Sequence, residues 1–75
     1  MRKSILAQVF AQLPELVIRY NLPSEIDPYV FDDTDDKTIT VTYGNNVLAF
    51  DYSGEFECYY VNTFRGGEVR RTVFD

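Results

Sequence analysis

The chain has 75 residues, a formal net charge of -5 and an apolar content of 45%. A chain of this size buries only about 60% of the surface that its unfolded state exposes, so we expect one small domain, residues 1–75. The composition excludes a disordered chain, and the sequence contains no run of ~18–20 apolar residues that could span a membrane.

The acidic residues are concentrated in the middle of the sequence. Residues 21–60 contain nine carboxylates and one base, Lys37, whereas residues 1–20 and 61–75 carry net charges of +2 and +1. Such a field attracts cationic partners and repels phosphate backbones. We therefore expect a protein partner with a basic surface, and no direct binding of nucleic acid or membrane.

Cysteine and histidine usage limits the chemistry of the chain. Cys58 is the single cysteine, so no internal disulfide can form, and we expect a reducing, cytoplasmic location. No histidine is present, so Cys58 has no imidazole base and no ordinary zinc site can be assembled. We expect a buried, unreactive Cys58, no cofactor and no enzymatic activity.

The first predicted element is a helix over residues 4–21. Its apolar residues recur at gaps of three and four and form one stripe: Leu6, Val9, Phe10, Leu13, Leu16, Val17 and Tyr20. Pro14 lies inside this stripe and predicts a kink or a break, because its ring clashes with the carbonyl of Phe10. Asn21 is suited to end the helix in a left-handed conformation.

Residues 22–37 read as an acidic connector. The run from Asp32 to Asp36 is too polar to pack and predicts a solvated loop. It does not follow the calcium pattern of an EF-hand, since counting from Asp33 places Gly44 at the twelfth position, where a glutamate is required. Weak cation binding stays open, and so does a short edge strand over Tyr29-Val30-Phe31.

From residue 38 to residue 74 the apolar period changes to two, which is typical of half-buried strands. In the first strand, Ile39, Val41 and Tyr43 share one face. Three turns then separate four strands: Gly44-Asn45-Asn46, Ser53-Gly54 and Arg65-Gly66-Gly67. We predict an α+β domain in which the helix covers one face of an antiparallel meander of about four strands.

Acidic side chains on the loop and on the second hairpin are the candidate site. Glu55 and Glu57 are two apart on a strand, so they project from the same face, about 6.6–6.8 Å apart along the backbone. The candidate partner-binding residues are Asp32, Asp33, Asp35, Asp36, Asp51, Glu55, Glu57 and the exposed aromatic Tyr59. The alternative interpretation is that these acidic side chains serve only to discourage aggregation.

These features favour a small acidic binding protein that inhibits or regulates a partner through its basic surface. That surface could be a nucleic-acid-binding groove in which carboxylates stand where phosphates would lie, as in short acidic anti-defence proteins of phages and mobile elements. The alternative hypothesis is a structural or assembly subunit with an aromatic homo- or hetero-oligomeric interface. A homodimer is compatible with either hypothesis.

Overall fold

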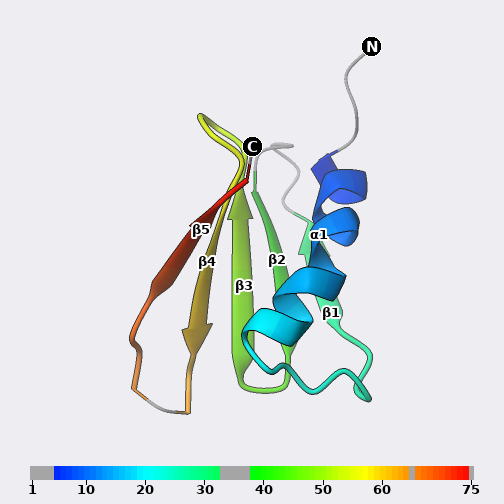
Figure 1. The fold of residues 1–75 in the computed structure, drawn as a ribbon, viewed down its shortest axis with the longest axis vertical. Coiled ribbons are helices and arrows are strands. Elements are labelled where there is room, and N and C mark those ends of the chain that lie inside the picture. Colours follow the sequence, from blue (N-terminus) through cyan, green and yellow to red (C-terminus); the bar gives the residue numbers. More distant parts are fainter. Residues whose placement is uncertain (1–4, 33–37, 65, 75) are drawn as a thin grey trace.

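The computed structural model describes residues 5–32, 38–64 and 66–74, with the side chain of Asp32 left aside. These residues form one helix packed on one five-stranded antiparallel sheet (Figure 1). The strand order is β1-β2-β3-β4-β5, a meander. The elements are α1 (Ile5–Arg19), β1 (Tyr29–Asp32), β2 (Thr38–Tyr43), β3 (Asn46–Asp51), β4 (Glu57–Asn62) and β5 (Arg70–Val73).

The α+β architecture is confirmed, but the sheet has five strands rather than four. The additional strand is β1, which pairs with β2 so that Val30 lies opposite Val41 and Phe31 opposite Thr40. Val30 packs against the core, while Phe31 points to the other face. The sequence left a short edge strand over Tyr29-Val30-Phe31 open, because so few residues alternate too briefly to identify a strand. The structure shows this strand as β1, which pairs with the edge of β2 that β3 does not occupy.

Helix α1 is continuous through Pro14, so the predicted break does not occur and a kink is not confirmed. Pro14 is exposed, whereas Leu13 and Leu16 on either side of it are buried. The proline lacks the N–H that would bond the carbonyl of Phe10. Packing of the apolar stripe against the sheet compensates for that one missing hydrogen bond, because most helix stability in proteins comes from such packing.

The helix ends as the sequence predicts. Asn21 adopts a φ of 52°, and the amide of Leu22 donates to the carbonyl of Val17 at 2.9 Å. The amide of Asn21 donates to the carbonyl of Ile18 at 3.3 Å. This pattern is a Schellman motif, and the buried side chain of Leu22 supplies its usual hydrophobic contact.

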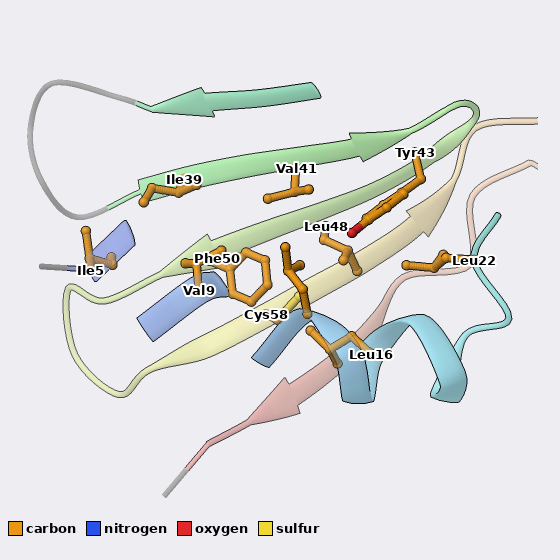
Figure 2. Close-up of a cluster of buried hydrophobic side chains, with 11 residues drawn as sticks. Ile5, Val9, Leu16, Leu22, Ile39, Val41, Tyr43, Leu48, Phe50 and Cys58 are labelled. Carbon is orange, nitrogen blue, oxygen red and sulfur yellow. The ribbon is translucent and has the colours of Figure 1, made fainter. Parts of the chain in front are cut away.

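The core lies between α1 and the central strands (Figure 2). Ile39, Val41, Leu48 and Phe50 have no exposed surface, and Cys58 is 1% exposed, as expected for a small buried side chain. The other buried members are Ile5, Val9, Leu13, Leu16, Leu22 and Tyr43. Each large aliphatic or aromatic side chain buried in this way contributes about 1.5–3 kcal/mol.

Within the described ranges, no helix is both long and apolar enough to cross a membrane.

Candidate functional site

The sheet face opposite α1 carries no second layer among the described residues. Strand register identifies its members, because Thr40, Ala49, Tyr59 and Arg71 lie directly across from one another on neighbouring strands. We call this surface the open face. It consists of Tyr29, Phe31, Thr38, Thr40, Thr42, Val47, Ala49, Asp51, Glu57, Tyr59, Val61, Arg71 and Val73.

Apolar and aromatic side chains occupy much of the open face. Tyr29 is 68% exposed, Phe31 56% and Val73 41%. Val47, Ala49, Tyr59 and Val61 are half-buried between them, and the threonines of β2 complete the surface. Soluble monomers expose few continuous apolar patches, and larger ones mark sites of interaction.

Three side chains of the open face form one hydrogen-bonded cluster around Glu57. The Tyr59 hydroxyl donates to Oε1 of Glu57 at 2.5 Å. Arg71 donates from Nε to Oε2 at 2.8 Å and also from Nη2 to the same oxygen. β4 and β5 place Arg71 opposite Tyr59, and Glu57 lies two residues away from Tyr59 on β4, so all three project from one face.

This cluster holds Glu57 in its charged form. The hydrogen bond from Tyr59, followed by that from Arg71, lowers the pKa of the Glu57 carboxyl below its ordinary value. The same contacts raise the pKa of Tyr59 and of Arg71. A catalytic acid would need a raised carboxyl pKa, so Glu57 is suited to hold a fixed charge and a fixed geometry.

Two more carboxylates lie at the same end of the sheet. Asp51 is directly opposite Glu57, and it accepts the amide hydrogen bond of Ser53 at 2.9 Å. Glu55 is exposed and lies 3.4 Å from Nη2 of Arg71. Three carboxylates and one guanidinium leave a net charge of -2, so Arg71 offsets only part of the negative charge.

The acidic run of residues 32–36 falls largely outside the described residues. Asp33, Asp35 and Asp36 belong to the part that is not described, and for Asp32 only the backbone is given. Asp32 ends β1 and Thr38 begins β2, where Thr38 lies opposite Asp51. The chain therefore leaves and re-enters the sheet at the end that carries Asp51 and Glu57.

Sequence reasoning did not identify Arg71 as the partner of Glu57. The pairing depends on the register between β4 and β5, which the intervening loop leaves undetermined. Tyr29 and Phe31 were also missed as site residues, because they join the open face only when β1 pairs with β2.

The thiol of Cys58 points into the core and is not part of the open face. Its burial raises the pKa of the thiol to about 12. In residues 5–32, 38–64 and 66–74, no three acidic, cysteine or histidine side chains are arranged to hold a metal ion.

Comparison of the chain with family models, with curated proteins and with solved structures found no match in any of the three.

Proposed function

We propose that this protein is a small non-enzymatic binding protein, an inhibitor or regulator that uses the open face to engage a basic surface of a partner protein. The supporting observation is that one surface combines exposed aromatic side chains with an acidic end. Tyr29 and Phe31 are exposed on β1, and Asp51, Glu55 and Glu57 leave a net negative charge at the end of the sheet.

An apolar centre with a charged border is the usual composition of a protein interface. Tyrosine is enriched among the residues that contribute most to binding energy. Tyr59 supports such a role, because its hydrogen bond to Glu57 fixes the ring before a partner arrives. The acidic end would increase the rate of encounter with a basic partner, since charge complementarity acts mainly on association.

The finer parts of the proposal rest on charge and composition. The protein acts in the cytoplasm. It does not bind nucleic acid itself, because its net charge of -5 opposes contact with phosphates. The basic surface of the partner is a nucleic-acid-binding groove, as for anti-defence proteins of phages and mobile elements. Asp32, Asp33, Asp35 and Asp36 also take part in binding the partner in this proposal.

A pair of charge-reversed variants tests the acidic end. Glu55→Lys and Glu25→Lys change the net charge equally, but Glu25 lies in the connector between α1 and β1, away from the acidic end. After affinity capture of the partner from the native host, association rates are measured at low and at ~1 M salt, where screening acts within ~3 Å. Glu55→Lys should slow association strongly and Glu25→Lys only slightly. Equal effects, or a rate that is independent of salt, would contradict the role of the acidic end.

A second pair tests the aromatic part of the open face. Phe31→Ser removes an exposed ring from β1, whereas Ile18→Ser removes an exposed apolar side chain from α1, on the other side of the sheet. The proposal requires that only Phe31→Ser weakens capture of the partner. Capture that is unchanged by Phe31→Ser and lost with Ile18→Ser would place the interface on the helix instead.

The position of Tyr29 and Phe31 on an edge strand also favours the second candidate function, an assembly subunit. β1 pairs on one side only, and its open edge contains neither lysine nor proline to discourage strand addition. Light scattering distinguishes the two candidates. A dimer that persists at ~1 M salt and is lost with Phe31→Ser would support assembly, whereas a monomer would support regulation.

A further inference from the structure

A cavity of about 420 Å³ lies where α1 ends, beside β4 and β5. Its lining includes Arg19, Tyr20 and Asn21 from the helix end, and Tyr60, Asn62 and Arg70 from the strands and the segments next to them. Tyr60 lies opposite Arg70 in the strand register, on the side of the sheet that faces α1. The cavity is therefore separate from the open face, and its volume lies in the range of small-molecule sites.

Two stacked tyrosines form a rigid apolar part of this cavity. The rings of Tyr20 and Tyr60 have centroids 4.2 Å apart and planes inclined by 8°. Both hydroxyls are engaged, that of Tyr20 with Oγ1 of Thr72 and that of Tyr60 with Oδ1 of Asn46, each at 2.8 Å. The position of the rings is thus fixed without a ligand, which reduces the entropy lost on binding.

The side chains that line the cavity carry a net positive charge, whereas the protein as a whole is negatively charged. The cavity contains two of the three arginines whose side chains the structure describes, Arg19 and Arg70, and one acid, Glu68. Arg19 contacts Glu15 and Oγ1 of Thr72, each at 3.3 Å. Within the described part of the chain, Arg70 has neither a hydrogen bond nor an ion pair. Its guanidinium is therefore available to a ligand.

We propose that this cavity binds a carboxylate group, with Arg70 as the ionic anchor and the tyrosine rings in contact with the apolar body next to the carboxylate. The planar guanidinium can hold a carboxylate through two parallel hydrogen bonds. Glu68 and the overall charge of -5 disfavour a doubly charged phosphate. The carboxylate belongs either to a free aromatic acid or to the C-terminus of a peptide.

Nuclear magnetic resonance titration of the full chain tests this site with defined probes. The probes are sodium benzoate for the free acid, N-acetyl-Gly-Phe for the peptide C-terminus, and N-acetyl-Gly-Phe-amide, which has the same body without the charge. We expect saturable shifts of the backbone amides of Asn21, Asn62 and Gly67, with a Kd of about 1 mM for such small probes. Benzoate and the free peptide acid identify the two sources of the carboxylate, and either one supports the site.

Arg70→Gln and Arg71→Gln provide a matched pair for the same titration. Both lower the net charge by one unit on β5, but Arg71 contacts Glu57 on the open face. Arg70→Gln should weaken binding at least about tenfold, as expected when a charged hydrogen-bond donor is removed, and Arg71→Gln should leave it nearly unchanged. Equal weakening by both variants, equal binding of the amide probe, or no saturable shift with either acid would overturn the proposal.

Discussion

Tyr20, the residue that follows α1, stacks on Tyr60 of β4 with 4.2 Å between ring centroids. This contact joins the end of the helix to a strand that is 40 residues further along the chain. The stack thus connects the stability of the fold with the geometry of the adjacent cavity.

The coupling between these two rings can be measured with a double-mutant cycle. Tyr20→Leu and Tyr60→Leu keep much of the apolar volume but remove the stacking. We expect the two free energies of unfolding to be non-additive by about 0.5–1.5 kcal/mol, the range for an aromatic pair beyond its burial. Urea unfolding of the four proteins gives the value, and additivity to within about 0.3 kcal/mol would contradict an energetic role for the stack.

Asn21 provides a test of the helix end. Its φ of 52° is costly for alanine but not for glycine. We expect Asn21→Ala to lower the free energy of unfolding by about 1 kcal/mol, while Asn21→Gly keeps it within about 0.5 kcal/mol of the wild type. Urea midpoints compare the three proteins. An alanine variant as stable as the glycine variant would mean that the left-handed conformation is not maintained in solution.

The hydrogen bond from Tyr59 should control the protonation of Glu57. Tyr59→Phe removes the largest contribution to the lowered pKa of Glu57, so that pKa should rise toward 4.5, as detected by carboxyl-carbon resonances during a pH titration. Since the folded pKa is depressed, the stabilisation is present above the ordinary pKa and is lost as the pH falls through the folded value. Tyr59→Phe should therefore flatten the loss of stability in acid.

Tyr29→Phe is the control for that experiment. Tyr29 lies on the same face, and in the described part of the chain its hydroxyl has no carboxylate partner. The pKa of Glu57 should not change in this variant. A change of equal size in both variants would indicate a general effect of the open face rather than the Tyr59 hydrogen bond.

Because of Cys58, the free energy of unfolding should be lower at alkaline pH than at neutral pH. Burial raises the pKa of its thiol from 9.0 to about 12, so the unfolded chain loses this proton at a lower pH than the folded protein does. The free energy of unfolding should then fall as the pH rises from about 9 toward 12. Chemical unfolding at several pH values measures this slope, and Cys58→Ala should reduce it. A slope that is unchanged in Cys58→Ala would show that the thiol is not the group responsible.

Several parts of the fold could be predicted because their signals are local. The stripe of α1, the left-handed Asn21 and the alternation of Ile39, Val41 and Tyr43 each depend on residues a few positions apart. Burial of Cys58 could be predicted in the same way, from its alternation with Phe56 and Tyr60. The predicted turn at Ser53-Gly54 also indicated that Asp51, Glu55 and Glu57 would lie near one another on one hairpin.

The features that the sequence left undecided depend on pairing between distant segments. A short edge strand over Tyr29-Val30-Phe31 stayed open in the sequence, and pairing with β2 makes it the strand β1. The continuity of α1 through Pro14 depends on packing of Leu13 and Leu16 against the sheet.

The amino-acid sequence by itself determined the helix, the turns, the apolar face of each central strand and the acidic character of the middle of the chain, because periodicity and turn chemistry are properties of adjacent residues. Only the tertiary structure decided that Arg71 pairs with Glu57 while its neighbour Arg70 lines a cavity with Tyr20 and Tyr60. The physical reason is that successive strand residues point to opposite faces, so register between strands determines which distant side chains meet.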